Sequence, residues 1–297
     1  MPFMLKKFQT IKGEKVQHFL QNVVGLSVSM SQKLLSKGRI FDENMNKLQN
    51  GQILKCEQVQ VALFEGHTRG LKPLFTAKDF ALFDKPSGIM VHPISRDTKY
   101  TLLDEIRYHF GDKANLAHRI DLETSGLVLV TRNRFADVEL KTMFENRDFS
   151  KKYIVVVKGK IENNITIDGK IAKDGGMIGV KMKVCENGKE STTLITPIKY
   201  LEDKNQTIVE AVTLTGRQHQ IRVHLDSIGH TIVGDPIYGI DEIIADKYLN
   251  KQLSAEDRLK HIGHDRLMLH ALYLEFKYDN KTYKFYSKQH FLNNYLI

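Results

Sequence analysis

The stretch AHRIDLETSGLVLVT, residues 117–131, has a polar first half and an apolar second half. The second half predicts a buried strand, and Gly126 interrupts it where another backbone or a ligand comes close. The first half contains six charged or hydroxyl residues: His118, Arg119, Asp121, Glu123, Thr124 and Ser125. Such groups at the mouth of a buried strand need partners or do chemistry, because burying them alone costs free energy. The residues alone leave open both a salt-bridged loop and a reactive site.

The composition describes a basic chain of 297 residues with a net charge of +9 and a pI of about 9.3. That length suits two domains, or one large domain with an appendage. The charge favours a polyanionic partner. No apolar run reaches the ~18 residues of a membrane span, so we expect no membrane partner. Cys56 and Cys185 match no metal spacing, and we expect free thiols in a reducing cytoplasm.

The first 70 residues carry ten Lys and Arg against five Asp and Glu. Apolar residues at helical spacing predict a first helix from Val16. A second helix is predicted to begin at Ser29 as N-cap and to end at Gly38. Strands are predicted at 39–41 and 53–64, followed by a linker at 65–73.

Two short helices followed by strands resemble the S-four-type RNA-binding module, also called the alpha-L motif. The resemblance makes Lys33, Lys37 and Arg39, which lie near the join, candidate RNA-binding residues. A small basic domain whose lysines are only solvated is the alternative. We therefore expect an RNA-binding domain at 1–70 and a catalytic domain at 71–297.

Three further helices are predicted in the rest of the chain. Thr101 is expected to cap the first of them, which Gly111 ends. Asn133 is expected to cap the second, and its apolar face would include Val138, Leu140 and Phe144. The third would bury Ile221, Leu225 and Ile228, and would place Arg222 near Asp226. Residues 240–265 are polar and are expected to form a surface insertion.

Six ordered motifs together resemble the RluA-type pseudouridine synthases. They are DKPSGIMVHP (84–93), HRIDLETSGL (118–127), KKY (151–153), GRQHQIRVH (216–224), HTIVGDPIYG (230–239) and RLMLHA (266–271). The resemblance covers about residues 75–297. It implies an α+β fold with a mixed, largely antiparallel sheet. For the first motif it implies a structural role behind the catalytic loop.

The resemblance also assigns roles to particular residues. Asp121 falls on the catalytic aspartate, Arg222 on the arginine that pairs with it, and Tyr153 on the tyrosine that lies against the target base. Arg119 is the candidate that fills the gap left by the flipped uridine. The remaining substrate-binding candidates are His118, Thr124, Arg217 and Leu269.

The family isomerises uridine in RNA by breaking the N1–C1′ bond, turning the uracil and joining C5 to C1′. This reaction needs no cofactor, and we expect none. Large-subunit ribosomal RNA is the substrate we expect, with tRNA left open, and we expect a monomer. The catalytic carboxylate must stay charged in a pocket that sheds water, and an opposed guanidinium such as that of Arg222 would lower its pKa.

Other interpretations are weighed against this one. Glu123 and Asp121 could be the paired carboxylates of a glycosidase, or the chain could be a nucleoside hydrolase that releases uracil. A non-catalytic RNA-binding assembly factor that keeps the fold is the alternative from another class. The pairs His219 with His224 and His261 with His264 lack a third ligand at a recognisable spacing, so we predict no metal site.

Overall fold

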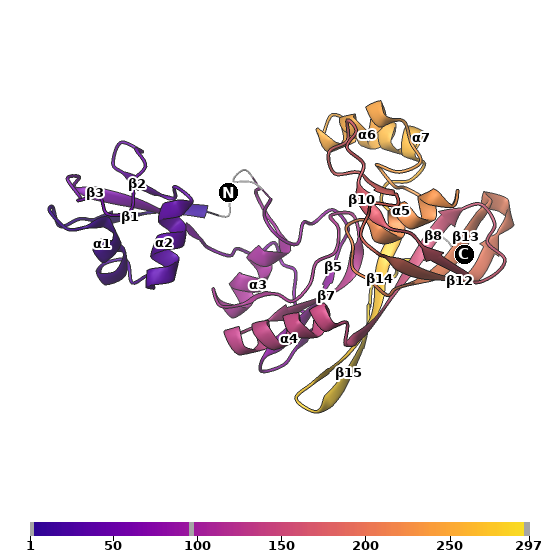
Figure 1. Cartoon of the computed structure of the whole chain (residues 1–297), viewed down its shortest axis with the longest axis horizontal. Coiled ribbons are helices and arrows are strands. Elements are labelled where there is room, and N and C mark those ends of the chain that lie inside the picture. Colours follow the sequence, from indigo (N-terminus) through magenta and orange to yellow (C-terminus); the bar gives the residue numbers. More distant parts are fainter. Residues whose placement is uncertain (1–2, 95–97, 294–297) are drawn as a thin grey trace. The chain divides into compact units, whose positions relative to one another are not determined.

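The structure is a computed structural model that describes residues 3–94 and 98–293 (Figure 1). The chain divides into two compact units, which we treat separately. The first unit comprises Met1–Gly70 and His92–Asp112, and the second comprises Leu71–Val91 and Lys113–Ile297. Among the described residues, no helix is long and apolar enough to span a membrane.

The first unit contains a three-stranded antiparallel sheet in the order β1-β3-β2, with two helices packed against it (Figure 1). Its elements are β1 (Phe3–Gln9), α1 (Val16–Asn22), α2 (Val28–Ser36), β2 (Ile40–Asp42) and β3 (Gln58–Phe64). Val16, Phe19 and Leu20 are buried, as their helical spacing predicts. The prediction of Ser29 as N-cap is wrong by two residues, since the Ser27 hydroxyl accepts from Met30 N–H.

Helix α3 (Leu102–Phe110) begins at Thr101, as predicted, in a capping box with Asp104. Residues 64–70 pack against it. A Cβ at Gly66 would lie 2.5 Å from the Asp104 carbonyl oxygen, and the Arg107 guanidinium lies 4.3 Å from the Phe64 ring centroid. The first residues of the segment predicted to be a linker, 65–73, therefore lie against α3.

The second unit is built on a ten-stranded sheet that is antiparallel except where β7 pairs with β14. The path β4-β5-β7-β14-β8-β13-β12-β9 carries β6 beside β7 and β15 beside β14. The strands are β4 (Phe75–Thr76), β5 (Phe80–Lys85), β6 (Asn115–Leu116), β7 (Ser125–Thr131), β8 (Phe149–Lys158), β9 (Ile165–Asp168), β12 (Thr192–Leu201), β13 (Gln206–Thr213), β14 (Leu269–Tyr278) and β15 (Lys281–Tyr286). This confirms the predicted α+β class with a largely antiparallel sheet.

The remaining elements flank this sheet. They are α4 (Arg134–Asn146), β10 (Ile171–Lys173), β11 (Met182–Val184), the 3-10 turn Glu202–Lys204, α5 (Gln220–Ser227), α6 (Glu242–Leu249) and α7 (Ala255–Ile262). Asn133 caps α4 as predicted, but Val138 is exposed, so the predicted apolar face is wrong there. Ile221 and Leu225 of α5 are buried against the sheet as predicted, but Ile228 is exposed, so the predicted buried stripe is wrong at its end.

β7 is buried along its whole length, and its parallel register with β14 depends on Gly126. Gly126 has φ +104°, and a Cβ there would lie 2.2 Å from the carbonyl oxygen of Ala271. Only glycine allows the two backbones to come this close, as the sequence predicted.

We expect Gly126→Ala to lower the free energy of unfolding by about 3 kcal/mol or more, because neither backbone can move away inside the sheet. Gly175→Ala is the matched control, since Gly175 also has a positive φ but nothing lies within 4 Å of its Cβ position. That change should cost about 1 kcal/mol. Urea denaturation followed by tyrosine fluorescence reports on the second unit, to which all tyrosines except Tyr100 and Tyr108 belong. Equal losses in the two variants would contradict the argument.

Candidate active site

A pocket opens in the second unit where β7 and β14 begin and α5 starts. Its lining comprises Arg119, Ile120, Asp121, Thr124, Tyr153, Thr213, Thr215, Gly216, Arg217, His219, Gln220, Ile221, Arg222 and Leu269. Because β7 and β14 are parallel, their first residues lie at the same edge of the sheet. This brings Asp121, just before β7, near Leu269, and Tyr153 on β8 pairs with Ala271 beside them.

Asp121 and Arg222 form an ion pair in this pocket. Arg222 Nη1 donates to Asp121 Oδ2 at 3.2 Å. The Asp121 side chain is 28% exposed, whereas that of Arg222 is 3% exposed. The carboxylate therefore faces the pocket while the guanidinium stands behind it.

Arg222 is held from its other side by Asp235, which sequence reasoning did not single out. Arg222 Nε and Nη2 donate to the two carboxylate oxygens of Asp235, each at 2.8 Å. Asp235 Oδ1 also accepts the backbone N–H groups of Ile237 and Tyr238. Burial acts to lower the pKa of Arg222, but Asp235 and then Asp121 raise it above its ordinary value. The cation is therefore permanent.

Tyr153 presents a half-buried ring to the pocket from β8. Burial and then Asp121 raise its pKa above the ordinary value, so the hydroxyl stays protonated at neutral pH. The Nζ of buried Lys151 lies 4.9 Å from the centre of this ring. Burial lowers the pKa of Lys151 to about 7, although Asp121 opposes the shift. Asp121 thus has a second basic group near it.

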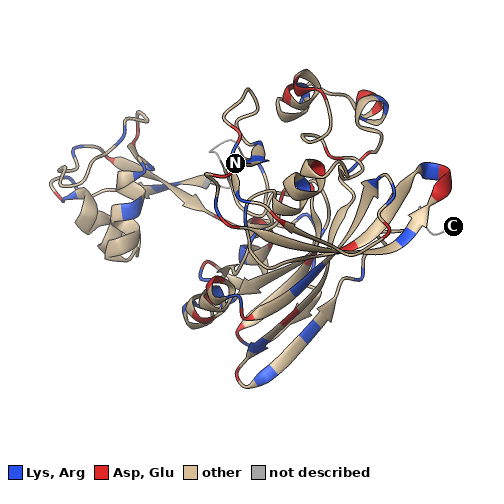
Figure 2. Cartoon of the chain, turned by 45° about the vertical axis from the view of Figure 1, so that its right-hand side comes forward, with Lys and Arg blue, Asp and Glu red and all other residues tan. Residues whose placement is uncertain are grey.

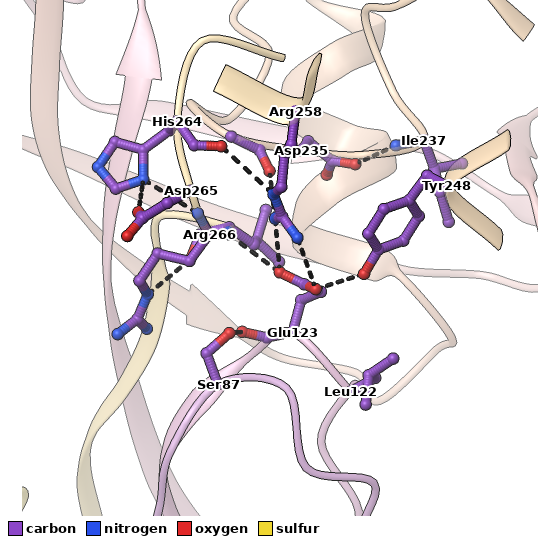
Figure 3. Close-up of polar contacts among 12 residues, drawn as sticks. Ser87, Leu122, Glu123, Asp235, Ile237, Tyr248, Arg258, His264, Asp265 and Arg266 are labelled. Carbon is purple, nitrogen blue, oxygen red and sulfur yellow. Dashed lines mark hydrogen bonds and ion pairs between the residues drawn. The ribbon is translucent and has the colours of Figure 1, made fainter. Parts of the chain in front are cut away.

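The turn that carries Asp121 packs against the segment after β5. That segment belongs to the motif at 84–93, for which we expected a structural role behind the catalytic loop. Buried Lys85 donates to the carbonyl oxygens of Pro86, Ile89 and Leu122 at 2.8–3.0 Å. Ser87 Oγ donates to the Glu123 carbonyl oxygen at 2.7 Å (Figure 3). Burial lowers the pKa of Lys85 to about 7, while three carbonyl acceptors match the three donors of its ammonium form.

Seven of the eight residues predicted for the catalytic and substrate-binding site line the pocket, and His118 is the exception. Its Nε2 accepts the Leu129 N–H at 3.0 Å, and its ring centroid lies 4.5 Å from that of Phe144. Burial keeps the pKa of His118 well below its ordinary value, so the ring is neutral. The structure places His118 against β7 and α4, behind the site.

His219 is a pocket residue that the sequence reasoning did not propose. It adopts a left-handed conformation with φ 55° at the start of α5, and its Nδ1 lies 3.1 Å from the Tyr238 hydroxyl. Burial, followed by the charge of Arg222, lowers the pKa of His219 to about 4. Its Nε2, 4.0 Å from Asp121 Oδ2, therefore belongs to a neutral ring at pH 7. The signal in the sequence that could have identified His219 as a pocket residue was its position in the motif at 216–224, which also contains Arg222.

Glu123 does not line the pocket, although it lies two residues from Asp121. Both of its carboxylate oxygens accept hydrogen bonds from Arg258, and Tyr248 donates to one of them (Figure 3). Burial acts to raise the pKa of Glu123, but Arg258 and Tyr248 bring it below its ordinary value. A glycosidase acid needs a raised pKa and access to substrate, so the paired-carboxylate interpretation is disfavoured.

The candidate RNA-binding residues of the first unit lie around the end of α2. Lys33 and Lys37 are exposed, and Arg39 is half-buried just before β2. Basic residues, blue in Figure 2, recur over the helices and strands of this unit. Across residues 3–94 and 98–293, no group of three or more His, Cys, Asp or Glu residues is arranged to hold a metal ion.

Comparison with known proteins gives relatives along nearly the whole chain. An uncharacterized RNA pseudouridine synthase of Helicobacter pylori is 34% identical over 287 residues, covering 96% of this chain and 93% of its own length. Ribosomal large subunit pseudouridine synthase D of Pseudomonas aeruginosa is 33% identical and covers 63% of this chain and 59% of its own. The tRNA pseudouridine(31) synthase of Saccharomyces cerevisiae is 29% identical, over 61% of this chain and 50% of its own length.

A solved structure and a family model agree with these relatives. The structure of human RNA pseudouridylate synthase domain containing 1 matches with a TM-score of 0.60 and 26% identity, over 76% of this chain and 86% of that one. The family model described as RNA pseudouridylate synthase matches residues 79–227, which include Asp121, Tyr153 and Arg222. The chain therefore belongs to the RNA pseudouridylate synthase family and is an isomerase that acts on RNA.

Proposed function

We propose that this enzyme converts specific uridines of large-subunit ribosomal RNA to pseudouridine, with Asp121 as its catalytic carboxylate. The observation that carries the proposal is the ion pair of Asp121 with buried Arg222, in a pocket that Tyr153 also lines. The Pseudomonas aeruginosa relative, by its name a large-subunit enzyme, supports ribosomal RNA, whereas the Saccharomyces cerevisiae relative is a tRNA enzyme. We keep tRNA as the second candidate substrate.

Asp121 and Arg222 suit the step that breaks the N1–C1′ bond. Whether Asp121 attacks as a nucleophile or removes a ribose proton, it acts as a carboxylate, and the guanidinium of Arg222 lies 3.2 Å from it. Arg222 gives up no proton in this step, because Asp235 raises its pKa above the ordinary value. Asp121 is thus the proposed reacting group and Arg222 its electrostatic partner.

Tyr153 and Arg119 suit the handling of the base. The uridine must leave its stack before its ring can enter the pocket. The exposed Arg119 side chain is the proposed group that fills the gap. The Tyr153 ring offers a stacking surface for the uracil while it turns, and its protonated hydroxyl can donate a hydrogen bond.

The family membership argues against an assembly factor without catalysis. A protein that only binds RNA also gains nothing from a carboxylate exposed to its binding pocket, and a buried arginine holds Asp121 there. A monomer in the cytoplasm remains our expectation. So does the assignment of residues 1–70 to an S-four-type RNA-binding domain.

We expect Asp121→Asn to reduce pseudouridine formation by about 10³-fold or more, since the reacting carboxylate is lost. Carbodiimide-stop sequencing of rRNA and tRNA, from cells lacking the gene and complemented with wild type or variant, measures this. The reverse-transcription stops that mark this enzyme's pseudouridines should vanish in the deletion strain and return only with the wild-type gene. Whether those stops lie in rRNA or in tRNA identifies the substrate. Stops that return with the asparagine variant would rule out Asp121 as the catalyst.

Asp235→Asn should lower the free energy of unfolding by about 3 kcal/mol, because buried Arg222 loses its two-pronged partner. It should also slow catalysis, since Arg222 is then free to shift relative to Asp121. Asp226→Asn is the matched control, because Asp226 lies on the same helix as Arg222 and accepts from the Thr231 hydroxyl at 2.7 Å. Urea denaturation and rate measurements on both variants check this, and equal stability losses would contradict it.

Replacing Lys33, Lys37 and Arg39 together by glutamine should raise KM for RNA about tenfold at 0.15 M salt and leave kcat unchanged. The salt dependence of KM should become shallower, because fewer counterions are released on binding. Lys12→Gln is the control, since Lys12 pairs with Glu57 at 3.0 Å. An unchanged KM in the triple variant would count against RNA binding by this face.

A further inference from the structure

Helices α6 and α7, within the segment predicted to be a surface insertion, reach the catalytic turn through two polar side chains. The two helices bury little of themselves, with Ala245 the buried residue of α6 and Ile262 that of α7. Tyr248 from α6 and Arg258 from α7 both point toward Glu123, as Figure 3 shows. The polar contact with Glu123 therefore links both helices to the catalytic turn.

Glu123 is 8% exposed and both of its oxygens are engaged. Arg258 Nη2 donates to Oε2 at 2.8 Å and Nη1 donates to Oε1 at 3.1 Å. Tyr248 also donates to Oε1 (Figure 3). The Leu267 N–H donates to Oε2 at 3.3 Å. A two-pronged charge pair with further donors defines one orientation of the carboxylate.

Arg258 is itself held in place. Its Nε donates to the His264 carbonyl oxygen at 3.3 Å, and its guanidinium lies 5.2 Å from the centre of the Tyr248 ring. Arg258 and Tyr248 therefore form one unit with Glu123. Loss of Arg258 would leave an uncompensated carboxylate in a buried position, which is far costlier than losing both partners.

The backbone of the same turn is fixed from the opposite side. Lys85 Nζ and Gly88 N–H both donate to the Leu122 carbonyl oxygen at 3.0 Å, and Ser87 donates to that of Glu123. Residues 122 and 123 are thus held by backbone and side chain, directly after Asp121. A catalytic group is placed accurately when its supporting residues are held in this way.

We infer that Glu123, Tyr248 and Arg258 are positioning residues through which the α6–α7 segment fixes Asp121 relative to Arg222. The inference rests on the proposed role of Asp121. None of the three residues lines the pocket, so we expect them to act on the chemical step through Asp121 and not through contact with the target uridine. The segment predicted to be a surface insertion is, on this view, a support of the active site.

Arg258→Met tests the inference. With large-subunit rRNA transcripts that carry 5-tritiated uridine, release of tritium measures the reaction, because the C5 proton is lost. We expect kcat to fall by about tenfold or more with KM unchanged, since a small displacement of a catalytic group is costly. Tyr248→Phe keeps its ring and loses one hydrogen bond, and it should lower kcat roughly threefold.

A double variant separates positioning from general damage. Glu123→Gln added to Arg258→Met should restore part of the lost kcat, because the unpaired buried charge is removed. Glu242→Gln is the matched control. It breaks the 3.0 Å ion pair of α6 with Lys181 but leaves Glu123 untouched, so its kcat should equal that of wild type.

The results distinguish the inference from the function on which it rests. Wild-type kcat in Arg258→Met, a rise in KM alone, or an equal loss in Glu242→Gln each overturns the positioning role while wild type remains active. A double variant no better than Arg258→Met also overturns it. If the wild-type enzyme released no tritium from rRNA or tRNA transcripts, and was thus as inactive as Asp121→Asn, both the proposed function and the inference would be contradicted.

Discussion

The site depends on one buried cation between two carboxylates. Arg222 binds Asp235 with two hydrogen bonds and Asp121 with one, so most of its interaction is structural and a smaller part faces the substrate. The unequal division of hydrogen bonds between the two carboxylates has two effects. Asp235 offsets the cost of burying the guanidinium, and the exposed side of Asp121 stays available for chemistry. A cation shared equally would bind Asp121 more firmly and leave it less reactive.

Much of the fold and site could be predicted because each motif carries its own local signal. The apolar strand after Asp121, the glycine within it and the helix that presents Arg222 were all found from the sequence. The pairing of Arg222 with Asp121 was predicted from the resemblance, whereas its pairing with Asp235 was missed. Helical spacing offered Asp226 as a potential partner of Arg222, but Asp235 binds the guanidinium from the following loop, and no periodicity reports such a contact.

Polar composition gave a correct but incomplete prediction for residues 240–265. The two helices of this segment lie largely on the surface, as predicted, but Tyr248 and Arg258 turn inward to a buried glutamate. Similarly, His118 lies within the most polar motif and yet packs behind β7. Sequence reports which residues are able to do chemistry, whereas burial and partners decide which of them are used for structure.

The parallel pairing of β7 with β14 determines when the pocket can form during synthesis of the chain. Ser125 and His270, which pair in this register, are 145 residues apart, and β14 also separates β7 from β8 in the sheet. The ribosome must therefore synthesise β14 before Asp121 and Tyr153 can be brought together. Until then β7 has an unpaired edge in a growing chain, which is a point of exposure to aggregation. The basic first unit emerges well before the pocket can form.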